Sequence, residues 1–267
     1  MIVDFHSHTR ESDGSLAPQA LCDLMVARGV SVFAVTDHDT LAAYGQFEAP
    51  ANMRVVTGIE INTTYCDNEV HILGYRLPLG PSPLLAVLER NRAERRKRIE
   101  RTVAQLAASR YPITMQEVEA ETEGGSVLGR PHVGKALIRK GLVRDIETAF
   151  RTLLRRGKPG YVPASHILPH EAIATILAAG GIPVLAHPGR LHDYDIIDEL
   201  ARHGLRGLEV FYPSHEPAQV QYFRDRAGQH GLVMTGGSDF HDIRYHKRGV
   251  GMDVEKRDIE PFLELVS

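Results

Sequence analysis

Nine residues of the types that bind divalent metals are spread along the chain, most of them at the end of a short apolar run. They are His6, His8, Asp13, His38, Glu60, His71, His187, Asp239 and His241. The strand-like run at 2–5 leads into His6, for example, and the run at 182–186 leads into His187. Ligands at the ends of many strands converge when the strands are parallel and wrapped around one axis, where barrel enzymes build active sites. The pattern predicts a multinuclear metallohydrolase.

The first two groups of predicted ligands differ in how specifically they indicate a metal site. His6 and His8 are two residues apart, so on a strand their imidazoles face the same side and can bind one metal. The same spacing also occurs in surface or core histidine pairs. Asp37 and Asp39 flank a histidine after an apolar run, and either carboxylate could orient that ring.

Glu60 and His71 are each ambiguous when taken alone. A carboxylate has two oxygens, so Glu60 could bridge two metals, or it could end a strand in a salt bridge. His71 lies inside a strand-like stretch and could be a buried histidine bonded to the backbone. The repeated placement of ligand types after apolar runs favours the metal site.

Composition fits one globular enzyme. The 267 residues are 43% hydrophobic and 24% charged, and a chain of this length can bury one large core. Cys22 and Cys66 lack a CxxC spacing, so we expect reduced cysteines. No signal segment precedes the first predicted strand and no apolar run approaches membrane length, so we expect a cytoplasmic protein without a membrane partner.

The net charge of −3 is unevenly distributed. Residues 80–165 contain 17 Lys/Arg and 9 Asp/Glu, whereas the other 181 residues contain 14 and 25. The basic segment is well placed to attract an anionic substrate. Its run of cations at 90–101 is interpreted as the solvated face of a long helix.

The basic segment is also predicted to be entirely helical. Apolar residues recur at helical spacing after Pro83. Thr114 and Glu117 form the pattern of a capping box, and Pro131 is placed to begin a further helix. No strand-like stretch interrupts this run.

Seven strands are predicted in the rest of the chain, with helices between them. The strands are expected at 2–6, 32–36, 54–63, 69–77, 182–186, 207–212 and 232–236, and the helices at 18–29, 169–180, 193–204 and 216–230. We therefore expect an α/β barrel built from 1–79 and 166–267, distorted around 54–77. Residues 80–165 would form a helical insertion that caps the site. Seven strands are too few for a full eight-fold barrel.

The motifs at these strand ends resemble those of the PHP (polymerase and histidinol phosphatase) family. They are HSHTRESDG at 6–14, TDHDT at 36–40, GIEI at 58–61, HILGY at 71–75, AHP at 186–188 and GGSDFH at 236–241, in the family's order. The helical insertion with GRPH at 129–132 is similar to that of bacterial members that act on nucleoside 3',5'-bisphosphates, including a relative that trims short RNA from its 5' end. The resemblance implies a distorted (β/α)7 TIM-like barrel, the PHP barrel, with three divalent metal ions at its carboxyl face.

The resemblance also implies how the ligands are shared. One metal would be held by His6, His8, Glu60 and Asp239, a second by Glu60, His71 and His187, and a third by Asp13, His38 and His241. The mixed histidine and carboxylate set suits manganese, zinc or iron, and manganese is favoured.

The expected reaction follows from the charge of this site. Three divalent cations outweigh the three carboxylates among the ligands, and a cationic pocket suits a phosphate monoester dianion. A hydroxide bridging two metals would attack phosphorus in line, because metal binding lowers the pKa of water from ~15.7 toward ~7. Glu60 and Asp239 are the expected catalytic carboxylates. The prediction is a phosphatase that removes the 3'-phosphate from nucleoside 3',5'-bisphosphates.

Substrate contacts are expected from five further residues. Arg130 and His132 enter a predicted helix and could hold a second phosphate, although a surface arginine and a helix-start histidine fit the same pattern. His215 follows a strand and could bind the scissile phosphate, protonate the leaving oxygen, or cap the next helix. Arg190 and Lys135 are further candidates.

Other functions are compatible with the same ligands. The site could cleave short 5'-phosphorylated RNA as a 5'-3' exoribonuclease, with the basic insertion holding the strand. It could also be a histidinol phosphate phosphatase or a non-catalytic PHP module. Few aromatic residues accompany the basic ones, so we expect a nucleotide or short oligonucleotide substrate and no stable nucleic-acid partner. The oligomeric state is left open.

Overall fold

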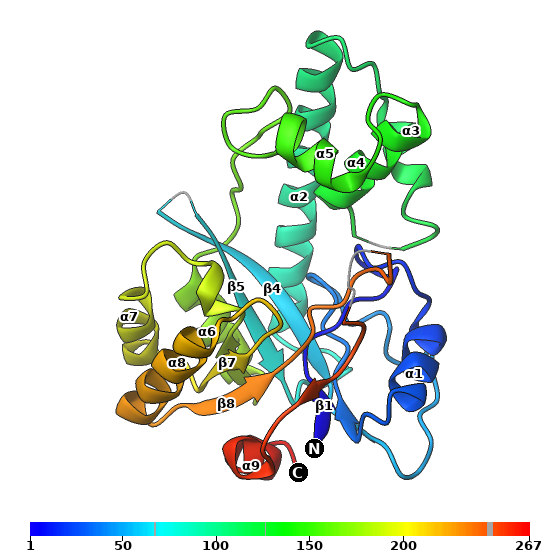
Figure 1. Cartoon of the computed structure of the whole chain (residues 1–267). Coiled ribbons are helices and arrows are strands. Elements are labelled where there is room, and N and C mark those ends of the chain that lie inside the picture. The colour runs from blue at the N-terminus through cyan, green and yellow to red at the C-terminus, as the bar shows by residue number, and fades with distance from the viewer. Residues whose placement is uncertain (67, 126, 245–247) are drawn as a thin grey trace.

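The strands form two sheets in a mixed α/β fold (Figure 1). The computed structural model describes residues 1–66, 68–125, 127–244 and 248–267. One sheet has the order β3-β2-β1-β9 and contains β1 (Ile2–Asp4), β2 (Val32–Phe33), β3 (Arg54–Val55) and β9 (Met252–Asp253). The other follows chain order and contains β4 (Gly58–Tyr65), β5 (Asn68–Tyr75), β6 (Ile182–Leu185), β7 (Gly207–Phe211) and β8 (Val233–Gly236). The predicted strands are all present, and β9 is an addition.

Backbone hydrogen bonds join the two sheets at both sides. Phe5 N donates to Gly236 O at 2.9 Å between the ends of β1 and β8. On the other side, Asp39 N donates to Glu60 O at 3.0 Å. The strand expected at 54–63 is divided, because β3 pairs with β2 and β4 pairs with β5. The two sheets therefore meet around one interior, and closure into a complete barrel stays a prediction.

Strand direction differs from the all-parallel arrangement expected for the ligand-bearing strands. β5 runs antiparallel to both β4 and β6, whereas β6, β7 and β8 are parallel. In this register His71 lies opposite Asn62, and Ile72 lies opposite Leu185 at the end of β6. The amino-terminal half of β5 thus shares an edge with the carboxyl ends of its neighbours. This direction brings His71 to the same edge as the other ligands.

Helices cover the outside of the sheets. They are α1 (Pro18–Ala27), α6 (Pro169–Ala178), α7 (Ile196–Arg202), α8 (Pro217–His230) and α9 (Lys256–Leu265). Three of them have proline in the first turn, where its missing N–H leaves no helical bond unmade. The additional helix α9 places Phe262 against Phe5 and Tyr75, with ring centroids 4.8 and 5.0 Å apart. Both termini of the chain lie beside α9 (Figure 1).

Most residues between β5 and α6 form a helical region beyond the carboxyl edge of the sheets, whereas Leu84 and Leu88 at its start pack in the main hydrophobic core (Figure 1). It contains α2 (Leu84–Ala108), α3 (Met115–Ala120), α4 (Arg130–Arg139), α5 (Ile146–Ala149) and a π-helix (Phe150–Leu154). Thr114 and Glu117 form the expected capping box. Leu106, Val118, Leu137 and other buried side chains of this region make their own hydrophobic cluster. The exact division into a barrel and an 80–165 insertion stays a prediction.

Among the described residues, every helix is too short or too polar to cross a membrane.

Candidate metal centre and active site

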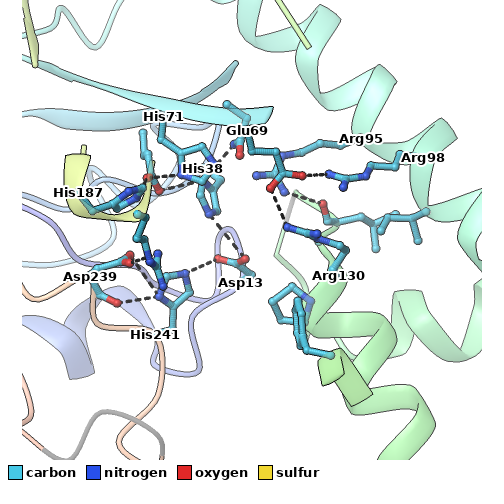
Figure 2. A pocket seen from close by; sticks show the side chains of 18 residues that line it. Asp13, His38, Glu69, His71, Arg95, Arg98, Arg130, His187, Asp239 and His241 are labelled. Carbon is cyan, nitrogen blue, oxygen red and sulfur yellow. Dashed lines mark hydrogen bonds and ion pairs between the residues drawn. The ribbon is translucent and has the colours of Figure 1, made fainter. Parts of the chain in front are cut away.

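The nine predicted ligands meet at the carboxyl edge of the sheets, and Figure 2 shows His38, His71, Asp239 and others of them across the pocket from the arginines of the helical region. His6 and His8 follow β1, His38 follows β2, and Asp239 and His241 follow β8. Eight of the nine residues make up three overlapping groups of potential metal donors, namely His6, His8, Glu60 and Asp239; His38, Glu60 and His71; and His8, Asp13, His38 and His241. The ninth, His187, lies with its Nε2 3.1 Å from Glu60 Oε1.

The first group has the spacing of donors around one small cation. His6 Nε2 lies 3.3 Å from both Glu60 Oε2 and Asp239 Oδ1. His8 Nε2 lies 3.2 and 3.3 Å from the same two oxygens. Donor atoms bound to one ion at ~2.0–2.2 Å lie about 3.0–3.5 Å from one another. These four distances are those expected for donors around one divalent metal.

The other two groups share residues with the first. His71 Nδ1 lies 2.7 Å from Glu60 Oε1, so the two oxygens of this carboxylate face different sets of histidines. His241 Nε2 lies 3.2 Å from Asp13 Oδ1, and His38 Nε2 lies 3.8 Å from Asp13 Oδ2. His8 belongs to the third group as well as the first. Glu60, His8 and His38 each belong to two groups and so connect them.

Buried polar atoms that make no hydrogen bond point to what the cluster binds. The buried atoms without a hydrogen-bond partner include His6 Nε2, His8 Nε2, His71 Nε2, Asp13 Oδ1 and Glu60 Oε2. A buried polar atom without a partner costs ~1–3 kcal/mol, and several in one place are unusual. Imidazole nitrogens and carboxylate oxygens are good ligands for a divalent cation, so the residues present fit metal ions.

Electrostatics lead to the same conclusion. Burial favours protonated carboxyls, but the nearby His38 and His71 outweigh it and hold the pKa of Glu60 well below its usual range. Burial lowers the pKa of His8, but Asp239 and Glu60 outweigh this and raise it to about 10. The buried carboxylates are therefore stabilised by positive charge beside them, which protonated histidines or bound cations can supply. Metal binding would release those protons.

Two carboxylates outside the ligand set hold the ligands in place. Glu209 is fully buried, with Oε1 2.9 Å from His6 Nδ1 and with Oε2 accepting from His187 N at 2.7 Å. A proton on His6 Nδ1 leaves Nε2 free to bind metal. Asp37 accepts from Thr9 N at 2.7 Å and so fixes the loop after the first histidines. His38 Nδ1 lies 3.0 Å from both Asn62 Nδ2 and Glu60 Oε2. Asn62 Nδ2 also donates to Asp39 Oδ2 at 3.0 Å, so Asp39 is linked to this ring through Asn62.

Strained backbone accompanies this cluster. His187, Asp239 and Asp39 have φ values of 29°, 52° and 52°, which non-glycine residues rarely adopt. Such conformations cost ~1–3 kcal/mol and persist where the surroundings enforce them. The hydrogen bond from His187 N to Glu209 is one such restraint.

A pocket of about 240 Å³ extends from the metal ligands to the helical region. Arg95, Arg98 and Arg130 line its far side (Figure 2). Arg98 Nη1 and Arg130 Nη2 bind the two oxygens of Glu69 at 2.6 and 2.7 Å. Arg95 and Arg98 are each only 9% exposed, so the interpretation of the 90–101 run as a solvated face is wrong for these two. One stripe of α2 faces the pocket.

The predicted substrate residues have different surroundings. Arg130 and Arg190 line the pocket, and Arg190 Nη1 donates to Asp239 Oδ2 at 3.0 Å. His132 is buried, and its Nδ1 accepts from Gly129 N at 2.9 Å, so its ring caps α4. Lys135 lines a separate hollow near Glu121.

His215 has both ring nitrogens engaged by the backbone. Nδ1 lies 2.9 Å from Val210 O and Nε2 accepts from Gly189 N at 3.1 Å. A Cβ on Gly189 would lie 2.5 Å from the ring of His215, so the two are in close contact. This geometry makes His215 a positioning residue for the turn after His187, and its roles at the scissile phosphate and the leaving oxygen stay predictions.

Several site residues were missed from the sequence. Glu209 lies inside the buried strand β7, and an acidic residue among Leu208, Val210 and Phe211 was a signal that could have been used. Glu69, Asn62 and the inward-facing arginines carry no such local signal. Their partners lie 29 or more residues away in most cases, as with Asn62 and Asn91 or Glu69 and Arg98.

Comparison with known proteins gives full-length relatives, although no family model matches the chain. The 3',5'-nucleoside bisphosphate phosphatase of Chromobacterium violaceum is 33% identical over 258 residues, covering 93% of this chain and 90% of that protein. The 5'-3' exoribonuclease Rnm of Escherichia coli is 33% identical over 90% of this chain and 85% of its own length.

Solved structures agree with these relatives. An amidohydrolase from Chromobacterium violaceum with bound sulfate and no metal has a TM-score of 0.88 at 30% identity, covering 98% of this chain and 95% of that one. A protein from Bifidobacterium adolescentis described as a metal-dependent phosphoesterase has a TM-score of 0.82 at 32% identity, covering 89% and 87%. Its motifs occur in the order of the family, its candidate ligands converge, and its relatives align over most of both chains. The chain therefore belongs to the PHP family of metal-dependent phosphoesterases.

Proposed function

We propose that this protein removes the 3'-phosphate from nucleoside 3',5'-bisphosphates, using three divalent metal ions, with manganese favoured. The observation that carries the proposal is a pocket with two ends that suit two phosphates. Metal ligands occupy one end, and Arg98 and Arg130 stand side by side on Glu69 at the other. The relative from Chromobacterium violaceum acts on this substrate class by its name.

The nine ligands would hold the ions in the three sets implied by the family motifs. The first set coincides with the group of His6, His8, Glu60 and Asp239. When bound, the ions would polarise the phosphoryl oxygens and lower the pKa of water toward ~7. Such ions are needed for charge as well, because the pocket walls carry four arginines and four carboxylates. Added cations would make the site attractive to a dianion.

The protein's own groups orient the substrate and the ligands. Arg190 is tied to Asp239 and lies over the ring of Tyr212, with Cζ 5.5 Å from the centroid, so its remaining N–H groups can meet a phosphate near the metal ligands. Arg130 would donate to the non-reacting 5'-phosphate. Its Glu69 partner fixes the direction of the guanidinium in advance, which lowers the entropy lost on binding. The 80–165 region would act as a substrate-binding cap.

A 5'-3' exoribonuclease acting on short 5'-phosphorylated RNA is the second candidate, supported by the likeness to Rnm of Escherichia coli. The same two ends of the pocket could take a terminal 5'-phosphate and the adjacent phosphodiester. A histidinol phosphate phosphatase is disfavoured, because its substrate has one phosphate and would leave the arginine end without a phosphate to bind.

One experiment tests these alternatives together. Phosphate release from nucleoside 3',5'-bisphosphates and histidinol phosphate should be measured beside nucleotide release from 5'-phosphorylated oligonucleotides, all with manganese present. We expect the bisphosphate to have the highest kcat/KM. Faster turnover of the oligonucleotide would favour the nuclease, and faster turnover of histidinol phosphate would refute the role of the arginine end.

A further inference from the structure

A second cavity lies beside the metal pocket and has no role in the function described so far. Its volume is about 550 Å³, compared with about 240 Å³ for the metal pocket, and Glu69 and Arg190 line both. Sites for drug-sized ligands span roughly 300–1,000 Å³. The metal pocket has room for phosphates but falls below this range for a whole nucleotide, so the rest of such a substrate needs other space.

The second cavity lies between the end of β4 and helix α7. Tyr65 from β4 donates through its hydroxyl to Glu199 Oε2 on α7 at 2.5 Å, and this bond fixes the tyrosine ring against the cavity. Val70 and Ile196 add apolar surface and are only 2% and 7% exposed. In Figure 1 the β4–β5 hairpin extends over α7, in agreement with this contact. The cavity therefore offers an aromatic ring and an apolar floor.

The charge of its walls opposes a phosphate. Four carboxylates line the cavity and only two arginines do. Arg190 is already paired with Asp239. One of the carboxylates, Glu69, is paired with Arg98 and Arg130. Asp193, Asp195 and Glu199 still outnumber the remaining arginine, Arg202. A wall rich in carboxylates repels an anion but accepts hydrogen bonds from hydroxyl and amino groups. The cavity thus suits a neutral planar group with several donors, whereas the metal pocket suits the anions.

We propose that this second cavity binds the base and ribose of the nucleotide while its phosphates occupy the metal pocket. The inference rests on the proposed function, since it assigns a place to the nucleoside part of that substrate. Arg190 and Glu69 form the boundary, so a nucleotide would pass over them from one space to the other. Ribose hydroxyls and base amino groups would donate to the wall carboxylates, and the base would lie against Tyr65.

The test compares two substrates in variants of the cavity. The measured quantity is the ratio of kcat/KM for a nucleoside 3',5'-bisphosphate to kcat/KM for 4-nitrophenyl phosphate, which has no nucleoside. Ile196→Trp should fill the cavity and lower this ratio at least ~10-fold, as expected when a binding contact is lost. Val26→Trp on α1, where the native side chain is 44% exposed, is the matched control.

Tyr65 supplies a second, milder perturbation. Stacking of a base on an aromatic ring is worth ~1–3 kcal/mol, so Tyr65→Ala should lower the ratio by roughly 5- to 150-fold. Tyr65→Phe keeps the ring and removes only the bond to Glu199, so it should restore most of the ratio. This pair remains informative if Ile196→Trp folds poorly.

The outcomes separate this inference from the proposed function. An unchanged ratio in both Ile196→Trp and Tyr65→Ala would overturn it. If kcat/KM falls equally for the two substrates, the ratio is also unchanged, and the cavity supports only the fold. If the wild-type protein releases no phosphate from bisphosphates, the proposed function itself has failed. A ratio that falls in these variants while Val26→Trp retains it would establish the nucleoside site.

Discussion

Replacing Arg130 by alanine tests whether the arginine end of the pocket holds the second phosphate. Arg130 Nη2 lies 2.7 Å from Glu69 Oε2, and Glu69 keeps its second partner, Arg98, at 2.6 Å. The substitution therefore leaves no buried carboxylate without a partner, and we expect a folded protein. A charged hydrogen bond to a phosphate is worth ~1.5–3 kcal/mol, or about 10- to 150-fold in kcat/KM. Because 26% of the Arg130 side chain is exposed, solvent screening favours the lower part, ~10- to 30-fold.

The assay measures kcat/KM for a nucleoside 3',5'-bisphosphate and for an aryl phosphate with the same metal. The aryl phosphate has no second phosphate, so its hydrolysis should change less than ~3-fold. Arg144→Ala is the matched control, because Arg144 lies in the same helical region, pairs with the partly exposed Asp145 and is 78% exposed. Thermal unfolding of both variants should be recorded beside the kinetics.

Two results would contradict this reasoning. Equal losses for both substrates in a well-folded Arg130→Ala protein would place Arg130 at the reacting phosphate. An unchanged kcat/KM for both would give Arg130 no part in substrate binding, and the two-ended pocket would lose its main support.

Four further predictions concern the metals and the groups around them. Chelation should abolish phosphate release and manganese should restore it, with close to three metals per chain by elemental analysis; full activity in a thoroughly demetallated sample would refute the mechanism. Glu60→Gln should lose at least one metal and lower kcat by roughly 10³-fold, since one amide oxygen bridges poorly, and normal metal content with normal kcat would exclude bridging. Glu209→Gln removes the carboxylate beside His6 Nδ1 and His187 N, so metal titration should show ~10- to 100-fold weaker binding, and unchanged affinity would limit Glu209 to packing. Burial lowers the pKa of His132 to about 4, so unfolding should cost about 2 kcal/mol less at pH 5 than at pH 7 through this group. This contribution to the free energy of unfolding is present above pH 6.5 and is lost as pH falls toward 4. In His132→Gln the free energy of unfolding, measured by denaturant titration at each pH, should depend less on pH than in the wild type. The same pH dependence in both proteins would contradict the prediction.

The sequence alone identified the candidate ligand set and determined most of the elements that carry it. Ligand types follow apolar runs directly, so strand and ligand are read from one short window, as at Asp239 after β8. Helix signals are equally local, and the capping box at Thr114 is present as predicted. These features depend on residues a few positions apart, which is why a single sequence reveals them.

Tertiary structure decided how the ligands are oriented and which cations face them. The antiparallel direction of β5 places His71 in the cluster, although its position inside a strand did not distinguish a ligand from a buried histidine. Arg95 and Arg98 turn inward because Asp39 and Glu69 lie 3.0 and 2.6 Å away.

Contacts between residues far apart in the sequence also decide the surroundings of His215. His215 lies beside Gly189, 26 residues earlier, and both of its ring nitrogens are engaged by the backbone. Whether a side chain is free to act on a substrate depends on partners that the fold brings from far along the chain. Local patterns contain no record of those partners, because long-range contacts form only when the whole core is packed.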